Sequence, residues 1–290
     1  MFQLGGETRL RAISFDAQAN GVLPIEVNAA WSQAPYGFPV IVGTTAYSYG
    51  QSLGRVPWEP GQFTWSSDGR FMCAVLPERA ASGSPLRLEV AFVGQPAKVV
   101  TSGFGSFGDN SSQRVLTCDE TTDRVIVGVF GQGFYATRLW IFKLSTGALL
   151  RSVDYGTGAA GRWLAASPDG SLLAEAERPT AGSPWTSKVR RTDDGAELAN
   201  FDDLLVRGFS GDNTLVVGES GGVTIVEWKA NRKVWSTAGV YGGHLPEPAG
   251  RRFAVGVGFL GGGDQRDLHL IDADGKAVLL HTIAVFAPRY

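Results

Sequence analysis

The motif at 218–222, Gly-Glu-Ser-Gly-Gly, matches the Gly-Xaa-Ser-Xaa-Gly pattern around the nucleophilic serine of many hydrolases. In those enzymes the serine lies on a sharp turn that leads from a strand into a helix. Here the residues that follow, 223–228, alternate apolar and polar side chains in the manner of a strand. We therefore interpret the motif as a turn between two strands, and we predict no catalytic residue.

Metal and phosphate chemistry find little support in the spacing of the polar residues. Asp267 and His269 would share one face of a strand, but the sequence nearby offers no third ligand, and a zinc site needs at least three. The glycine run at 261–263 follows a strand pattern and opens no helix, unlike a phosphate-binding loop. The prediction is no metal and no cofactor.

The charge balance excludes a protein that is basic overall. Lys and Arg number 26 and Asp and Glu number 28, so the net charge is −2. The basic runs at 188–191 and 251–252 adjoin a single aromatic residue, Phe253, which is too few for a base-stacking platform. We interpret both runs as solvated strand ends and predict no nucleic-acid partner.

The sequence shows no membrane-spanning run of 18 apolar residues and no signal-peptide pattern at its start. We therefore expect no membrane insertion and a cytoplasmic location. Cys73 and Cys118 each lie within an apolar run, which predicts two buried, reduced thiols.

The elements that must position any site are predicted to be short strands. The chain contains 39 glycines and 31 aromatic residues (16 Phe, 8 Trp and 7 Tyr), a composition typical of strands joined by tight turns. Segments 86–92, 138–143, 223–228 and 267–272 alternate apolar and polar residues, and each precedes a tight polar turn and another strand pattern. Helical periodicity over 11 or more residues with caps is absent, so helix content should be near zero.

One turn recurs along the whole chain, with its clearest copies at 66–69 and 167–170. Six markers of this turn follow one another at intervals of 48, 54, 47, 42 and 38 residues: Gly21, Gly69, Asp123, Gly170, Asp212 and Gly250. The mean interval of about 46 residues is the length of a four-stranded propeller blade. We predict an all-β fold, a single β-propeller domain over 1–290 with six four-stranded blades, approximately 8–57, 58–103, 104–154, 155–201, 202–239 and 240–287. Seven blades of about 41 residues are the alternative.

The turn Ser167-Pro168-Asp169-Gly170, followed by Ser-Leu-Leu-Ala, resembles the repeat of WD-like propellers of the TolB and peptidase-propeller kind. Trp140 and Trp228, near the ends of third strands, resemble the tryptophans of WD repeats. The resemblance implies propeller architecture over most of the chain and no specific activity, since propellers carry many functions. It also implies that the aspartate of the turn is structural and caps turn amides.

Loop lengths predict which end of the blades carries function. The first-to-second and third-to-fourth turns are tight, whereas the second-to-third loops and the links between blades are long. Long loops on a rigid scaffold are where binding residues concentrate. The candidate binding residues are the aromatic residues of these loops and the polar residues at first-strand starts: Tyr36, Trp58, Phe104, Phe107, Phe134, Tyr135, Tyr155, Trp185, Tyr241, Arg114, Arg162, Arg207 and His244.

The predicted function is a non-catalytic protein-interaction or scaffold propeller that presents this aromatic face to a protein or peptide partner, also as a subunit of a larger assembly. The alternative is a hydrolase or lactonase-type propeller whose site lies in the central channel. First-strand starts are rich in Arg and Gln and contain no carboxylate, which favours binding over metal-assisted hydrolysis. A small-molecule ligand in the channel is compatible with both.

Overall fold

The computed structural model describes residues 10–16, 21–27, 31–32, 40–42, 45–48, 51–58, 63–66, 70–107, 112–131, 135–156, 160–211, 213–219, 221–230, 232–246, 252–258, 265–272 and 275–284. These residues divide between two compact units. Unit 1 comprises Met1–Leu53 and Arg207–Tyr290, and unit 2 comprises Gly54–Val206. Both are built from antiparallel strands, and the described ranges contain no helix.

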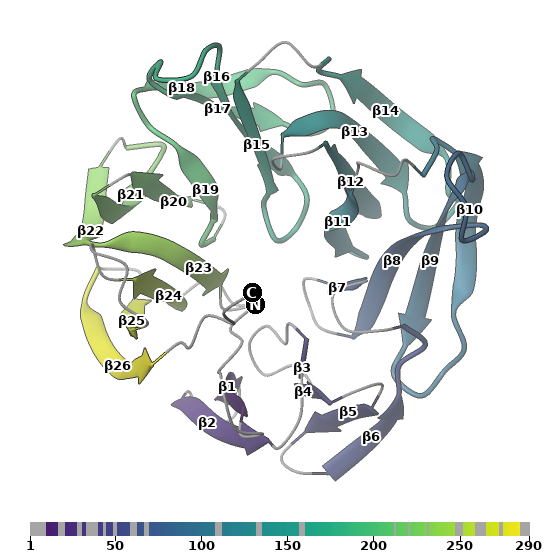
Figure 1. The fold of residues 1–290 in the computed structure, drawn as a ribbon, viewed down its shortest axis with the longest axis horizontal. Helices are drawn as coiled ribbons and strands as arrows, with labels where there is room; N and C mark the ends of the chain where they lie inside the picture. Colours follow the sequence, from purple (N-terminus) through teal and green to yellow (C-terminus); the bar gives the residue numbers. More distant parts are fainter. Residues whose placement is uncertain are drawn as a thin grey trace. The chain divides into compact units, whose positions relative to one another are not determined.

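Unit 2 consists of three four-stranded antiparallel sheets, each a meander in which consecutive strands pair. The first sheet holds β7 (Phe63–Trp65), β8 (Phe71–Pro77), β9 (Leu86–Phe92) and β10 (Lys98–Phe104). The second holds β11 (Ser112–Asp119), β12 (Arg124–Phe130), β13 (Ala136–Lys143) and β14 (Leu149–Asp154). The third holds β15 (Gly161–Ala166), β16 (Leu172–Arg178), β17 (Thr186–Arg191) and β18 (Glu197–Asp202). The first strand β11 contacts both β7 and β15, while β10, β14 and β18 form the far edges of their sheets (Figure 1).

Unit 1 repeats the same meander. One sheet holds β19 (Val206–Phe209), β20 (Thr214–Glu219), β21 (Gly222–Glu227) and β22 (Arg232–Ala238), and the next holds β23 (Val240–Pro246), β24 (Arg252–Gly258), β25 (Gln265–Asp272) and β26 (Ala277–Ala284). A further four-stranded sheet holds β3 (Trp31–Ser32), β4 (Val40–Val42), β5 (Thr45–Ser48) and β6 (Gln51–Arg55), the last of which crosses into unit 2. A two-stranded sheet holds β1 (Leu10–Asp16) and β2 (Gly21–Val27). Residues 8–57, predicted as one blade, therefore contain two sheets.

The all-β prediction is confirmed in the described ranges, and the four segments predicted to precede the second turn of each repeat are strands. Segment 86–92 is β9 with the same bounds, and 138–143, 223–228 and 267–272 correspond to β13, β21 and β25 within three residues at each end. The match is close because alternating side chains and turn residues are local signals. The serine motif at 218–222 joins β20 to β21, so it leads into a strand, as predicted.

The position of a strand in its sheet explains its composition. Strand β12 lies between β11 and β13 and is apolar at almost every position, because both of its faces are covered. Strand β14 lies at an edge and leaves Leu149 and Leu150 exposed. Edge strands are covered on fewer sides, so their sequence carries more polar residues and fewer buried ones.

The core of unit 2 fills the spaces between neighbouring sheets. Residues of β8, β9, β11, β12 and β13 form one cluster that joins the first two sheets, and it includes both cysteines, Cys73 and Cys118, as thiols with no exposed surface. A second cluster, with Ile126, Leu139 and Leu173 at its centre, joins the second sheet to the third. In unit 1, Val216, Ile225 and Val255 belong to a cluster that joins the β19–β22 and β23–β26 sheets.

The Ser167-Pro168-Asp169-Gly170 turn is held by its own side chains. The Asp169 carboxylate accepts hydrogen bonds from the Ser171 amide at 3.0 Å and from the Ser167 hydroxyl at 2.6 Å. The Ser167 hydroxyl oxygen in turn accepts the amide of Leu172 at 2.9 Å. Asp169 is therefore a structural turn residue, as the resemblance implied, whereas Asp68 lies outside the described residues.

The same turn also fastens two sheets of unit 2 together. The hydroxyl of Thr117 in β11 donates to the carbonyl of Pro168 at 2.7 Å, and the hydroxyl of Thr122 donates to the carbonyl of Asp169 at 2.6 Å. Because these bonds join sequence positions about one repeat apart, the recurring turn contributes to packing between repeats as well as to chain reversal.

Candidate functional site

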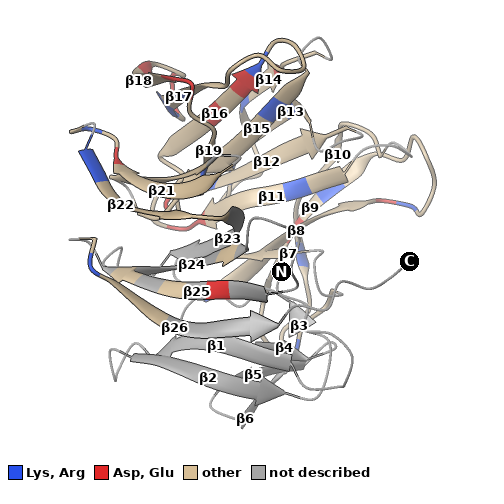
Figure 2. Ribbon diagram, turned by 60° about the vertical axis from the view of Figure 1, so that its left-hand side comes forward, with Lys and Arg blue, Asp and Glu red and all other residues tan. Residues whose placement is uncertain are grey.

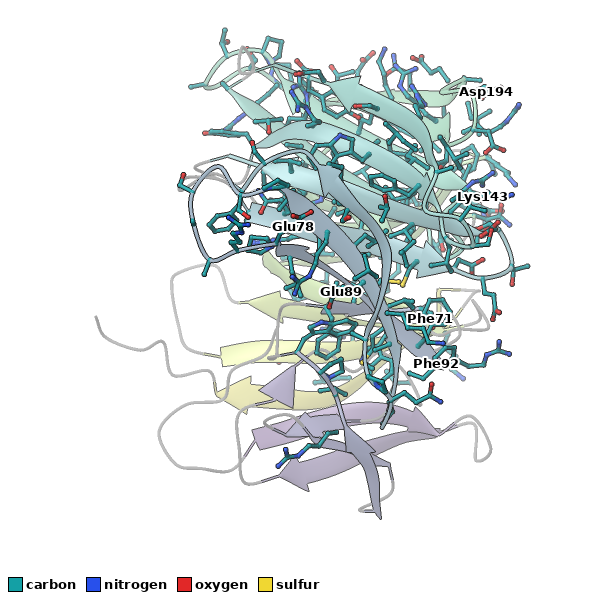
Figure 3. The ribbon with its side chains drawn as sticks, turned by 90° about the vertical axis from the view of Figure 1, so that its right-hand side faces the viewer. Phe71, Glu78, Glu89, Phe92, Lys143 and Asp194 are labelled. Atoms are coloured by element: carbon teal, nitrogen blue, oxygen red, sulfur yellow. The ribbon has the colours of Figure 1, made fainter. Side chains whose placement is uncertain are left out.

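The two ends of the sheets in unit 2 differ in their loops. We call the end formed by 78–85, 105–107, 131, 135, 155–156, 160 and 179–185 the link end, and the opposite end, formed by 93–97, 120–123, 144–148, 167–171 and 192–196, the turn end. Figure 3 shows Glu78 at the link end and Lys143 and Asp194 at the turn end. Among the residues predicted to bind a partner, Phe107, Tyr135, Tyr155 and Trp185 belong to the link end.

Several predicted residues lie outside the described part of the structure or in unit 1. Tyr36 and Phe134 are outside the described residues. Tyr241 and His244 have described backbones in β23, a strand rather than the predicted link for Tyr241, and their side chains are outside the described residues. Arg207 lies near the start of β19, as predicted, and is half-buried.

Trp58 is not an exposed aromatic residue, contrary to the prediction. Its indole is buried and donates a 2.9 Å hydrogen bond to the Glu89 carboxylate, which also accepts 2.6 Å from Arg87. The ring lies 5.9 Å from that of Phe63. The buried indole supplies a hydrogen bond to a buried carboxylate and packs against the first sheet of unit 2. Trp58 therefore offers no surface for a partner.

Phe104 and Phe107 also pack inward. The Phe104 ring lies 5.4 Å from Trp140 in an edge-to-face arrangement and 4.7 Å from Phe142, at the margin of the core. The Phe107 backbone exchanges 2.7 Å hydrogen bonds with Gly83 and Ser84, which joins the link after β10 to the loop after β8. The composition of these loops indicated aromatic surface, but the apolar cluster beneath them draws two of the rings into half-buried positions.

Arginine side chains lie over aromatic rings repeatedly at the link end. Arg114 lies over Phe130 at 5.7 Å, Arg138 over Trp140 at 5.8 Å, Arg162 over Tyr155 at 4.8 Å and Arg178 over Trp185 at 5.1 Å. These pairs come from the second and third sheets of unit 2, and Figure 2 shows basic segments on β11 and β13. Guanidinium groups over ring faces are attracted by the ring quadrupole, which fixes the otherwise flexible arginines.

Tyr135, Arg114 and Arg138 are exposed on this surface. Tyr135 is 40% exposed, and its carbonyl accepts a 2.8 Å hydrogen bond from the Gly131 amide that closes the loop between β12 and β13. Arg114 is exposed near the start of β11. Arg114 lies over Phe130 of strand β12, whereas the buried Arg162 lies over Tyr155, one of the loop aromatic residues.

Trp185 closes the loop between β16 and β17 onto the start of β15. A Cβ atom at Gly161 would lie 2.7 Å from the Trp185 ring and 2.9 Å from Nε of Arg178, so glycine is needed for this close packing. The amide of Ala160 donates to the carbonyl of Pro179 at 3.2 Å. Trp185 is half-buried and positions the loop rather than standing free of it.

Tyr155 and Arg162 form the most extensively bonded pair. Arg162 is buried, donates 2.9 Å to the Tyr155 carbonyl and forms a 2.9 Å ion pair with Glu177, the residue directly opposite it on β16. The Tyr155 hydroxyl donates 2.5 Å to Glu175. Burial, followed by the charge of Glu175, raises the pKa of Tyr155 well above its usual value, so the phenol stays protonated.

The sequence analysis missed four charged residues that share this face of the third sheet. Glu175 and Glu177 alternate along β16, and Lys188 and Arg190 alternate along β17. Arg190 pairs with Glu175 at 2.9 Å and with Glu197 at 3.3 Å, and Lys188 pairs with Glu197 at 2.9 Å. Lys188 and Arg190 are thus part of an ion-pair network and not solvated strand ends, which corrects the prediction for 188–191.

Alternation could have revealed the two charged rows, although not their pairing. Residues two apart on a strand point to the same face, so Glu-Ala-Glu at 175–177 and Lys-Val-Arg at 188–190 each place two charges together. The pairing register sets Glu175 opposite Lys188 and Glu177 opposite Thr186. What the sequence could not show was that the register brings the two pairs side by side.

The network borders a hollow of about 260 Å3 that is lined by Tyr155, Glu175, Glu177, Pro179, Thr186, Lys188 and Arg190. The charged groups around it balance, with carboxylates on Glu175, Glu177 and Glu197 and cations on Arg162, Lys188 and Arg190. Hydrogen bonds and charge from Lys188 hold the pKa of Glu197 below its usual range, which keeps this carboxylate ionised.

The described side chains include no group of three or more His, Cys, Asp or Glu residues that could hold a metal ion. No helix within the described ranges is long and apolar enough to span a bilayer. His269 lies in β25, as expected of a strand residue, with its ring 5.3 Å from Trp235, and burial lowers its pKa against the opposing effect of Asp267.

No protein-family model matches the chain, and no curated protein matches it. Among solved structures, the chain is similar to KlHsv2 with loop 6CD replaced by a Gly-Ser linker, with 11% identity and a TM-score of 0.43 over 76% of this chain and 64% of that one. It is similar to a structure described as the eukaryotic initiation factor, with 9% identity and a TM-score of 0.46 over 93% of this chain and 70% of that one. It is also similar to a chain of the Mitotic Checkpoint Complex, with 11% identity and a TM-score of 0.45 over 78% and 80% of the two chains. The chain thus spans less than two thirds of the length of the first of these structures.

Proposed function

We propose that this chain is a non-catalytic β-propeller that binds a protein partner through the link end of its blades, and that it acts as an interaction module or as a subunit of a larger assembly. The recurring four-stranded meanders in both units support the propeller, because this meander is the blade of that architecture. The described residues form six four-stranded sheets and one two-stranded sheet, a number that is compatible with the six blades we predict and with the seven-blade alternative.

The observation that carries the binding proposal is the recurrence of arginine–aromatic pairs at one end of two neighbouring sheets. Arginine and aromatic residues are enriched where proteins bind one another, because they supply large contact area together with directional hydrogen bonds. Here the rings are fixed by the core, and the guanidinium groups are fixed by the rings. A partner would therefore meet a surface that loses little conformational entropy on binding.

The turn end has a different character. Arg124 pairs with Asp193 across two sheets, Arg191 pairs with Asp194 at 2.9 Å, and Lys143 pairs with Asp123 at 3.7 Å. These pairs hold turns together, and Lys143, Arg191 and Asp194 are exposed to water, where ion pairs contribute little to stability or to recognition. The turn end therefore provides matched control positions.

The experiment compares two double variants of the tagged chain in its native host. Arg114→Ala with Tyr135→Ala removes two exposed side chains near the link end, and Lys143→Ala with Arg191→Ala removes two exposed cations of the turn end. We expect the wild type and the turn-end variant to retain the same protein partner. The amount of this partner recovered with the link-end variant should be lower by roughly tenfold or more. Equal retention by both variants, at unchanged melting temperatures, would contradict the proposal.

A further inference from the structure

We infer that the hollow beside Tyr155 binds a neutral, polyhydroxylated molecule about the size of one sugar ring. The inference is independent of the protein-binding proposal, since it concerns a small-molecule site on one face of the third sheet of unit 2. It begins with the size of the hollow. At about 260 Å3 it lies just below the roughly 300 to 1,000 Å3 of pockets that enclose drug-sized ligands, so it suits a single ring.

The charge balance of the lining selects against a charged ligand. Each of the three carboxylates of the network already faces a cation: Glu175 faces Arg190, Glu177 faces Arg162, and Glu197 faces both Lys188 and Arg190. An anion or a cation entering the hollow would have to separate one of these pairs and would leave a partly buried charge without its counter-ion. A neutral ligand avoids this cost.

The remaining hydrogen-bonding capacity suits hydroxyl groups. Lys188 has three donors, of which one is directed at Glu197, and each carboxylate oxygen can accept more than one hydrogen bond. The Thr186 hydroxyl adds a group that both donates and accepts. A hydroxyl of the ligand can donate to Glu177 and accept from Lys188 at the same time, which extends the network without breaking it.

The geometry is fixed before any ligand arrives. Tyr155 is held by its 2.5 Å hydrogen bond to Glu175 and by Arg162 over its ring, and Arg190 is held by Glu175 and by the carbonyl of Gly195 at 3.0 Å. Pro179 supplies the apolar patch of the lining against which the C–H groups of a sugar ring can pack. A polar network this well bonded loses little entropy when a ligand binds.

The test uses the purified full chain without any protein partner, so that its outcome is separate from that of the pull-down. Saturation-transfer NMR and calorimetry are run with glucose, galactose, mannose, N-acetylglucosamine and myo-inositol as probes. Inorganic phosphate, an anion, and choline, a cation, serve as the charged comparators. We expect at least one of the neutral probes to bind with millimolar affinity or better, and we expect both charged comparators to bind more weakly.

Two lysines provide a matched pair of variants. Lys188 in β17 and Lys143 in β13 both lie in third strands, pair with a carboxylate and are 36% and 46% exposed, but only Lys188 lines the hollow. Lys188→Met should weaken sugar binding about tenfold or more, whereas Lys143→Met should leave it unchanged. Glu177→Gln, which keeps the shape of the side chain, provides a second variant if Lys188→Met lowers the melting temperature.

Three results would overturn the inference. The first is that none of the neutral probes binds. The second is that phosphate or choline binds more tightly than every sugar, which would make the hollow a site for charged ligands. The third is that sugar binding persists unchanged in Lys188→Met and in Glu177→Gln, which would place the site elsewhere on the chain.

Discussion

The phenolic hydroxyl of Tyr155 donates a 2.5 Å hydrogen bond to Oε1 of Glu175, and this bond ties the link after β14 to the middle of the neighbouring sheet. Because Tyr155 directly follows β14 of the second sheet and Glu175 lies in β16 of the third, the bond helps to fix the relative position of two sheets in unit 2 as well as the wall of the hollow.

Replacing Tyr155 with Phe should lower the free energy of unfolding by about 1 to 2 kcal/mol at pH 7, the usual contribution of a hydrogen bond to a charged group. Glu175 keeps its bond to Arg190, so the carboxylate retains a partner. Urea unfolding of both proteins at pH 7 measures the difference. A loss below the error of the measurement would show that the bond contributes no net stability.

The stabilities of the wild type and of Tyr155→Phe should also respond differently to alkaline pH. The pKa of Tyr155 is raised in the folded protein, so its contribution to stability is complete below the unfolded value of about 10 and falls as the pH rises above it. Between about pH 10 and 11 the wild type should lose more stability than Tyr155→Phe, and the gap between them should narrow. A constant difference in stability between the two proteins would contradict a raised pKa for Tyr155.

Asp169 tests the recurring turn. Burial raises the pKa of its carboxyl, but the hydrogen bonds from Ser167 and Ser171 outweigh burial and hold that pKa below its usual value. Asp169→Asn should cost about 1 to 2 kcal/mol at pH 7, and the difference from wild type should shrink as the pH falls below about 4, where the wild-type carboxylate becomes protonated. Thermal melts from pH 7 to pH 3 measure both. A difference that grows toward low pH would contradict this role for the carboxylate.

Alanine variants of two glycines distinguish the cost of a strained backbone from the cost of steric overlap. Gly147 and Gly83 have positive φ angles of 69° and 78°, so alanine is strained by about 1 to 2 kcal/mol at either position. A Cβ at Gly147 would also lie 2.2 Å from the Val100 carbonyl oxygen in the adjacent sheet, whereas Gly83 has open space. Gly147→Ala should therefore lower the melting temperature clearly more than Gly83→Ala, and similar shifts for the two variants would contradict the close approach.

The two cysteines report on the core of unit 2. Cys73 and Cys118 have no exposed surface, so a thiol reagent should label them only after local or global unfolding. Labelling at the rate of a free thiol under native conditions would contradict this burial. Labelling that accelerates with denaturant in step with the loss of the folded signal would support it.

The strands were predictable because alternation and turn chemistry act within a few residues. The contrast between Trp58 and Tyr135 shows where this local reasoning ends. Both are aromatic residues in loops or links, yet Trp58 reaches Glu89, which lies 31 positions further along the chain, and becomes buried. Tyr135 is bonded through its backbone carbonyl to the nearby Gly131, and its side chain remains exposed. Exposure depends on such distant partners, which a sequence pattern does not identify.

The charged rows of the third sheet show a related limit. Each strand shows its two alternating charges in the sequence. Whether these charges form a network depends on the register between β16 and β17 and on Tyr155, which donates a hydrogen bond to Glu175. A register shift of one residue would turn one strand's charges to the opposite face. The hollow is therefore a property of the pairing rather than of either strand alone.

The central claim, that a protein partner binds at the link end, is tested most directly by crosslinking in the native host. A photoreactive amino acid replaces Tyr135, which is 40% exposed at the link end, or Leu150, which is 53% exposed on the edge strand β14. Both are exposed apolar residues of unit 2, so accessibility alone does not favour position 135. The account predicts a discrete protein adduct from position 135 and none from position 150. An adduct from position 150 with none from position 135 would contradict it.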